Sequence, residues 1–348
     1  MTIPLTNRMK EVLKMVIEDY IDLAGPVSSM TIARKSDLGL SSATIRNIMS
    51  DLEEMGLLSQ PHTSAGRVPT ERGFRFYVDY ILDVNELSSQ EKREIRSRYL
   101  AHSFEGKDLF RETCKMLSAS SHYLGVVLAP RLSELVLQHI EFVKLRKRLV
   151  LAIFVSTTGI VQNRIIEVDE DLSQSKLDHL SDELNKLLTG LTLQQVRERL
   201  FNQMRMEKYA YDRLFLEAIK LGGKAFSSFD ETDVFIEGRT NILSEPEFGN
   251  ISIMTDLFRA FEEKATMVKL LDKCMEPKGV RISIGSESQV QEMETCSLVT
   301  STYGCKGRTL GALGVIGPRR MNYSRIVPLV DYSAKILNEI LETYYSVE

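Results

Sequence analysis

The sequence predicts a multidomain α+β protein with a helical N-terminal part. Its 348 residues are enough for two or three domains that each bury a hydrophobic core. The first eighty residues place apolar side chains at helical spacing, and strand-like runs then stand before and after a helix-rich middle. Strands on both sides of the helices indicate one α+β domain that is interrupted by an insertion.

Composition and charge exclude several classes of protein. Hydrophobic residues make up 43% of the chain and charged residues 26%, which is typical of a folded protein. No stretch holds eighteen consecutive apolar residues, and Arg8, Lys10 and Glu11 stand where a signal peptide would be apolar. We therefore expect a soluble, cytoplasmic protein. The net charge of -4 gives no overall attraction to nucleic acid, so such a role needs local positive charge.

The sequence predicts neither a metal site nor a cofactor. Its four cysteines are far apart and form no C-x-x-C pair, and its five histidines are isolated. The glycines at 311–317 have the spacing G-x-x-G-x-x-G inside a strand pattern, which speaks against a nucleotide-binding loop. The sequence also lacks the P-loop and G-x-S-x-G motifs. We therefore expect that the protein is not an enzyme.

Three helices are predicted at the N-terminus from apolar spacing and capping residues. Between Thr6 and Gly25 apolar residues recur at every third or fourth position, which indicates an amphipathic helix. Ser28 opens a short second helix, and Ser41 caps a third that runs to about Met55. Two helices joined by a tight turn that contains glycine are typical of a helix-turn-helix.

The third helix has two different faces. Its apolar side chains share one side, which carries Ile45, Ile48, Leu52 and Met55. The opposite side carries Ala43, Arg46, Asn47 and Ser50, with Ser42 at its flank. Asn pairs with adenine edges, Arg with guanine edges or phosphate, and an Ala methyl can meet a thymine methyl. We therefore expect the N-terminal half of this helix to face a major groove.

A wing is predicted after the third helix. Two short extended pieces at 57–60 and 67–69 flank a turn-rich segment at 62–66, and Thr70 then caps a fourth amphipathic helix. Residues 1–75 hold nine basic and nine acidic residues, but segments 28–49 and 59–75 each hold three basic residues against one acidic. Positive charge therefore gathers on the presumed DNA face. The alternative is a winged helix that contacts protein.

Four segments of the chain resemble one known family. They are SSATIRN at 41–47, HTSAGRVPT at 62–70, NILSEPEF at 241–248 and GVIGPRRMNY at 314–323. Together they closely resemble the bacterial heat-inducible transcription repressor HrcA, and the resemblance spans the chain. It implies a winged helix-turn-helix head, a GAF-like α+β domain and an inserted helix-rich dimerising domain.

The resemblance and the element pattern together give expected domain boundaries. We expect a winged-helix DNA-binding domain at 1–84, a linker at 85–104, a discontinuous GAF-like domain at 105–192 and 275–348, and an inserted dimerising domain at 193–274. Strands are expected at 124–129, 135–143, 149–156, 161–168, 234–236, 280–284, 297–303 and 310–316. Helices are expected at 176–188, 193–221, 253–271 and from about 324 to 344.

The function that the resemblance implies is sequence-specific repression of heat-shock (chaperone) operons. The repressor would bind an inverted-repeat operator on double-stranded DNA as a homodimer. Dimerisation is also favoured physically, because one winged helix covers only a half-site. In the family the active state is thought to need the GroEL chaperonin, so misfolded protein that occupies the chaperonin during heat stress would relieve repression.

The candidate DNA-binding residues are Ser42, Ala43, Arg46, Asn47, His62, Ser64 and Arg67. The first role is base reading, which we expect of Ala43, Arg46 and Asn47. The second is contact with phosphate or the minor groove, which we expect of Ser42, Ser64 and Arg67, with His62 beside them on the wing.

Two further interpretations concern the body of the protein. Arg319 and Arg320 stand before the last helix and suggest either an anion site or, more simply, a solvated turn. A competing hypothesis for the whole chain is a ligand-responsive regulator whose GAF-like body binds a metabolite. The sequence offers no convergent set of polar pocket residues for it, and fold analogy is weak evidence for a ligand.

Overall fold

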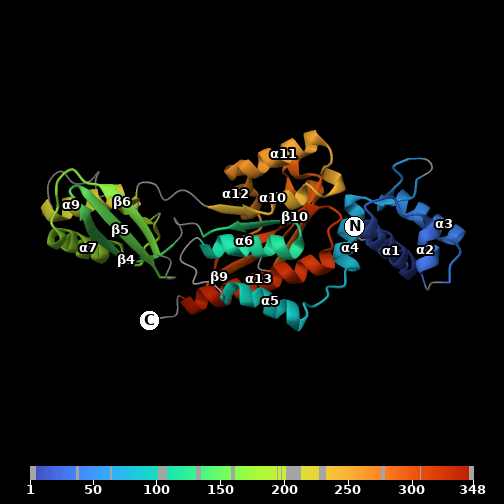
Figure 1. Ribbon diagram of the computed structural model, residues 1–348, viewed down its shortest axis with the longest axis horizontal. Helices are drawn as coiled ribbons and strands as arrows, with labels where there is room; N and C mark the ends of the chain where they lie inside the picture. The colour runs from blue at the N-terminus through green and yellow to red at the C-terminus, as the bar shows by residue number, and fades with distance from the viewer. Residues whose placement is uncertain are drawn as a thin grey trace.

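The computed structural model describes residues 5–344 except 37–38, 63–64, 101–107, 131–134, 158–160, 194, 197, 201–212, 227–232, 276–278 and 306. The fold is elongated and has three parts, a head, a body and an insert (Figure 1). The head lies at one end, the insert at the other and the body between them. The multidomain α+β class is therefore confirmed.

The head consists of four helices and a small two-stranded sheet. Its elements are α1 (Asn7–Leu23), α2 (Ser29–Lys35), α3 (Ser42–Glu54), β1 (Leu58–Ser59), β2 (Val68–Pro69) and α4 (Glu71–Tyr80). The predicted caps are confirmed, since the side-chain oxygens of Thr6, Ser28, Ser41 and Thr70 each accept from a backbone N–H of the first turn. Short polar side chains thus satisfy donors that each helix start would leave unpaired.

The body is an antiparallel five-stranded sheet of order β7-β3-β10-β9-β8. Its strands are β3 (Leu124–Leu128), β7 (Val234–Glu237), β8 (Val280–Ile284), β9 (Cys296–Cys305) and β10 (Arg308–Pro318). On one face lie α5 (Ser89–Leu100), α6 (Asp108–Ser121) and α13 (Tyr323–Tyr344). On the other lie α10 (Arg239–Ile242), α11 (Ile251–Glu262) and α12 (Lys264–Asp272). Strand residues alternate between the two apolar clusters, so both faces of the sheet are buried.

The insert is a separate three-stranded sheet of order β4-β5-β6, and helices cover one of its faces. Its elements are β4 (Leu137–Arg146), β5 (Leu149–Ser156), β6 (Val161–Glu167), α7 (Gln174–Leu188) and α9 (Arg213–Phe226). Its core is a cluster of its own, to which β5 contributes Val150, Ala152 and Phe154. The alternating apolar residues of β5 thus place every second side chain against the helices.

The expected domain boundaries differ from this arrangement and need correction. The apolar cluster of the insert runs from Leu137 to Ala225, whereas we had expected an insertion at 193–274. The strands at 137–167 leave the body sheet, and β7 with α10–α12 returns to it. A strand pattern in the sequence indicates that a strand exists but not which sheet it joins. Here β7 joins the body sheet because its backbone pairs with β3.

Two local expectations also need correction. The expected linker at 85–104 contains α5, which buries Ile95 and Tyr99 against the body and does not act as a free tether. The single helix expected at 253–271 is two helices, because Glu263 has φ -74° and ψ 88°, which is not helical. The remaining expected strands and the last helix are confirmed within three residues. Much of the helix expected at 193–221 lies outside the described residues, and its last part belongs to α9, which continues to Phe226.

Candidate nucleic-acid interface

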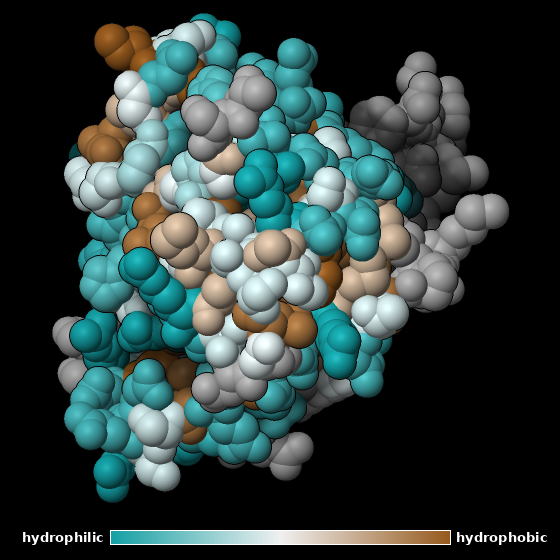
Figure 2. Space-filling model, turned by 90° about the vertical axis from the view of Figure 1, so that its right-hand side faces the viewer, coloured by the Kyte–Doolittle hydropathy of each residue, from teal (hydrophilic) through white to brown (hydrophobic). Residues whose placement is uncertain are grey.

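The outer face of α3 is the core of the candidate interface. Ser42, Ala43, Arg46 and Asn47 are all exposed, as the sequence predicted. The inner face buries Ile45, Met49 and Leu52 in the head, which fixes the rotation of the helix. Viewed from the head end, the surface is mainly hydrophilic with scattered apolar side chains (Figure 2). The helix therefore presents polar and small side chains to solvent.

The start of α3 is suited to an approaching phosphate. Ser41 caps the helix, and its first turn contains no acidic residue. The unpaired N–H groups and the helix dipole make such an end favourable for an anion. The acidic residues of α3 all lie in its C-terminal half, so negative charge is confined to the end of the helix that is farther from its capped start.

The positive charge near α2 is partly neutralised within the head. Lys35 at the end of α2 donates to Asp19 of α1 over 2.5 Å, and this hydrogen bond raises the pKa of Lys35. Arg46, by contrast, is exposed on the outer face of α3. Arg46 is thus better placed than Lys35 to meet a phosphate or a base.

The wing is anchored to the loop that precedes α2. Leu58 pairs with Pro69 and Ser59 with Val68, and the backbones of Val27 and Arg67 exchange hydrogen bonds of 2.9 and 2.8 Å. A Cβ at Gly66 would overlap the backbone of Val27, so only glycine fits this crossing. His62 is exposed near the tip of the wing, whereas Ser64 lies outside the described residues.

Arg67, for which we expected contact with phosphate or the minor groove, forms an ion pair with an acidic residue of α3. Its Nε lies 2.8 Å from Oε2 of Glu53 on α3, and its side chain is only 16% exposed. The ion pair joins the base of the wing to the C-terminal half of α3. Arg67 therefore holds the wing and α3 in a fixed relation, a role that the sequence pattern did not reveal.

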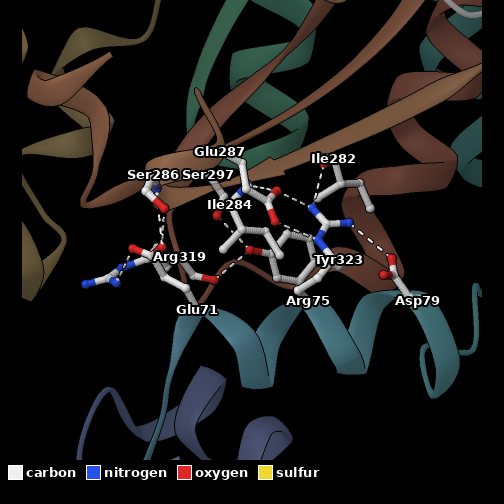
Figure 3. Close-up of polar contacts among 10 residues, drawn as sticks. All are labelled: Glu71, Arg75, Asp79, Ile282, Ile284, Ser286, Glu287, Ser297, Arg319 and Tyr323. Atoms are coloured by element: carbon white, nitrogen blue, oxygen red, sulfur yellow. Dashed lines mark hydrogen bonds and ion pairs between the residues drawn. The ribbon is translucent and has the colours of Figure 1, made fainter. Parts of the chain in front are cut away.

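Arg75 does not lie on the positively charged face to which the sequence assigned it. We had counted it toward the positive DNA face, but it extends from α4 to the body (Figure 3). Its guanidinium donates to both carboxylate oxygens of Glu287, over 2.9 and 2.5 Å, and to the carbonyl of Ile282 over 2.7 Å. The pattern of α4 gave no sign of this, because both partners are more than two hundred residues away in sequence.

Arg319 and Arg320 form ion pairs instead of the expected solvated turn or anion site. Arg319 donates to Glu71 of α4 over 2.9 Å. Arg320 donates to Glu245 over 2.6 Å and to Glu247. Two of the segments that carried the resemblance, 241–248 and 314–323, therefore meet in space.

The described part of the chain shows little that would serve another chemistry. Among these residues no group of His, Cys, Asp and Glu could hold a metal ion. Their helices are all too short or too polar to cross a membrane. The four cysteines are buried, and burial raises the pKa of Cys296 to about 12, which disfavours a reactive thiolate.

Comparison with known proteins gives two family matches. Residues 4–78 match the family described as "Winged helix-turn-helix transcription repressor, HrcA DNA-binding". Residues 107–327 match "HrcA protein C terminal domain". Both halves of the chain thus match the same kind of protein.

Full-length relatives and a solved structure agree with these matches. The heat-inducible transcription repressor HrcA of Geobacter sulfurreducens is 48% identical over 338 residues, which cover 97% of this chain and 98% of the relative. That of Syntrophobacter fumaroxidans is 42% identical over 340 residues, with 97% and 98% covered. A crystal structure of a hypothetical protein has a TM-score of 0.64 at 21% identity and covers 98% of this chain and 100% of its own. That likeness shows a common fold.

Proposed function

Since the chain belongs to the HrcA family of heat-inducible transcription repressors, we propose that it represses chaperone genes by binding an inverted-repeat operator as a homodimer. The observation that carries the proposal is the outer face of α3, whose exposed N-terminal half combines small, amide and guanidinium side chains. Such a face fits a major groove, where a recognition helix contacts base edges with its N-terminal residues. No catalytic step is part of this function.

The candidate residues divide into three roles. Ala43, Arg46 and Asn47 read base edges, and Ser42 binds phosphate at the helix start. His62 and Ser64 on the wing contact the backbone or the minor groove. Arg67 contributes indirectly, because its ion pair with Glu53 positions the wing beside α3.

The insert supplies the dimer interface in this proposal. The face of its sheet that α7 and α9 leave uncovered carries Val143, Leu151, Ile153, Val155, Val161 and Ile165. Val161 and Ile165 are 53% and 61% exposed, although both are β-branched and apolar. The other four named residues are half-buried, and Glu141 and Asn163, which both pair with Ile153, share the face with them. A largely apolar face of this kind marks an interaction site. A second copy of the same face would cover it with two-fold symmetry, as an inverted repeat requires.

Dependence on the GroEL chaperonin is supported by the topology of the body. Strand β3 pairs with β10, and about 180 residues, including the whole insert, must be made between them. Strand β7 pairs with one edge of β3, but the other edge stays open until β10 is available. Such long-range pairing folds slowly and exposes the chain to aggregation. Heat stress, by occupying the chaperonin, would then lower the supply of folded repressor.

One titration tests the DNA-binding proposal. Fluorescence anisotropy of the full chain is measured with an inverted-repeat chaperone operator and with a scrambled duplex of equal composition, at two salt concentrations. We expect operator affinity at least about 10³ times that for the scrambled duplex, with weaker binding to both at high salt. Equal affinity for the two duplexes would contradict sequence-specific repression.

A refolding experiment tests the chaperonin part separately. Denatured protein is diluted with or without GroEL, its cofactor and ATP, and the yield of operator-binding protein is measured. We expect the yield to rise several-fold with the chaperonin. Equal yields would remove the chaperonin from the mechanism and leave the DNA-binding proposal intact.

A further inference from the structure

The head and the body share one apolar seam. Phe74 of α4 lies between Tyr20 of α1 and Tyr323 at the start of α13, with ring centroids 6.1 and 6.4 Å away. Tyr323 is fully buried, and its hydroxyl donates to the carbonyl of Arg319 over 2.7 Å. Residues of both parts belong to a single apolar cluster. The head is therefore docked on the body and does not hang from a flexible tether.

Two sets of polar contacts from α4 fix the direction of docking (Figure 3). Arg75 donates to both carboxylate oxygens of Glu287 and also to a carbonyl of β8. One turn earlier, Glu71 accepts from Arg319 over 2.9 Å and from the hydroxyl of Ser286 over 2.7 Å. A bidentate arginine–carboxylate pair restrains orientation as well as distance. The two sets lie on one helix, so they oppose both tilting and rotation of α4.

A third contact approaches the head from a different side. Arg320 is only 11% exposed, donates to Glu245 and Glu247 of the body, and also donates to the carbonyl of Ile21 over 3.0 Å. That carbonyl belongs to the last turn of α1, where unpaired carbonyls favour a cation. The body thus holds the head at α1 and at α4.

We propose that this seam sets the half-site spacing that the dimer recognises, with Arg75 and Glu287 as positioning residues that touch no DNA. The inference rests on the proposed function. In a dimer joined through the inserts, the separation and rotation of the two α3 helices depend on how each head sits on its body. One added base pair moves a half-site by about 3.4 Å and rotates it by about 35°. A rigid seam rejects such a change, whereas a loosened seam accommodates it.

The test compares operators that differ only in spacer length. Full-length parent, Arg75→Gln, Glu287→Gln and the double variant are titrated against the operator, against operators with one base pair added or removed, and against a single half-site. Arg75→Lys keeps the charge but loses the two-pronged contact. Lys115→Gln is the matched control, because it breaks an ion pair with Glu112 inside α6, away from the seam. Thermal unfolding identifies any variant that fails to fold.

We expect the parent and Lys115→Gln to lose at least about tenfold in affinity when the spacer changes by one base pair. Arg75→Gln and Glu287→Gln should lose less than about threefold, with unchanged half-site affinity. The double variant should match Arg75→Gln, because that change already breaks the contacts of Arg75 with both Glu287 and the carbonyl of Ile282. For Arg75→Lys, the loss of affinity on changing the spacer should lie between that of the parent and that of Arg75→Gln. Folded variants that keep the spacing profile of the parent would overturn the inference. A parent that binds operator and scrambled duplex equally would instead overturn the proposed function and this inference with it.

Discussion

Gly66 lies where the wing crosses the loop before α2, and its lack of a side chain decides that crossing. A Cβ there would overlap the backbone of Val27, which cannot move without breaking its paired hydrogen bonds to Arg67. We predict that Gly66→Ala lowers the free energy of unfolding by about 2–4 kcal/mol. Gly25→Ala is the control, because its Cβ would meet only Leu23 O at 3.7 Å. Urea unfolding measures both, and equal stability would contradict the steric reason.

Arg46 and Asn47 are the residues on which specificity should depend. Each is exposed on α3, so its removal disturbs no core. We predict that Arg46→Ala and Asn47→Ala each cost about 1–3 kcal/mol in operator binding and reduce the preference over scrambled DNA. Glu54→Gln, exposed at the far end of the same helix, should leave that preference unchanged. Anisotropy titrations provide the comparison, and unchanged specificity in both alanine variants would exclude α3 as the reading element.

For single residues, the sequence predicts the exposure of a side chain better than it predicts its ion-pair partner. The apolar stripe of α3 correctly placed Arg46 and Asn47 on the outside, since periodicity determines which face is buried. It could not reveal that Arg67 pairs with Glu53 or that Arg75 reaches Glu287, because those partners are set by tertiary contact. Local net charge therefore overestimated the positive charge available to DNA.

The whole helix α4 depends on its N-cap residue, Thr70. Thr70 accepts from the N–H of Gly73 over 3.0 Å and donates to the carbonyl of Gly56 over 2.7 Å, so it joins the helix to the end of α3. We predict that Thr70→Ala lowers stability by about 1–2 kcal/mol. Thr70→Ser keeps both hydrogen bonds and should lose less than half as much. Thermal unfolding would contradict the capping argument if the two variants were equally unstable.

Elements were predicted well by local signals, but their assembly was not. The bounds of β5 and β8 agree with the expected strands because alternation and flanking turns are local properties. The partition of strands between two sheets depends on which strands pair, and β3 pairs with β7 and β10 rather than with its neighbour β4. Domain boundaries placed from the order of elements alone were therefore wrong by tens of residues.

The apolar face of the insert makes a prediction for the assembled molecule. Ile165 pairs with Leu151 on the neighbouring strand, and its side chain is 61% exposed. A charge at this position would therefore oppose burial of the apolar face in a dimer without disturbing the core of the insert. We predict that Ile165→Lys shifts the protein toward monomer and weakens operator binding by at least about tenfold. Leu243→Lys, at a 47% exposed residue of the body, should remain dimeric. Sedimentation velocity measures the change, and a dimeric Ile165→Lys would place the interface elsewhere.

Alkaline pH should destabilise the whole molecule through the phenol of Tyr77. Burial and the neighbouring Glu18 raise its pKa from 10.0 to about 12. Between these values the unfolded chain releases a proton that the folded chain keeps, so the stability present below pH 10 is lost as pH rises. At pH 11 this loss amounts to about 1 kcal/mol. Because Tyr77 lies in the cluster shared by head and body, the loss should appear in the cooperative unfolding of both.

Two variants on the same helix test this pH dependence. Tyr77→Phe keeps the ring but removes the ionisable group, so its unfolding free energy should fall less steeply between pH 9 and 11 than that of the parent. Tyr80→Phe is the control, because Tyr80 is 57% exposed and should leave the slope unchanged. Urea unfolding at several pH values gives the three slopes. If Tyr77→Phe keeps the full slope, the alkaline loss arises from other groups such as the buried thiol of Cys296, whose raised pKa acts in the same direction.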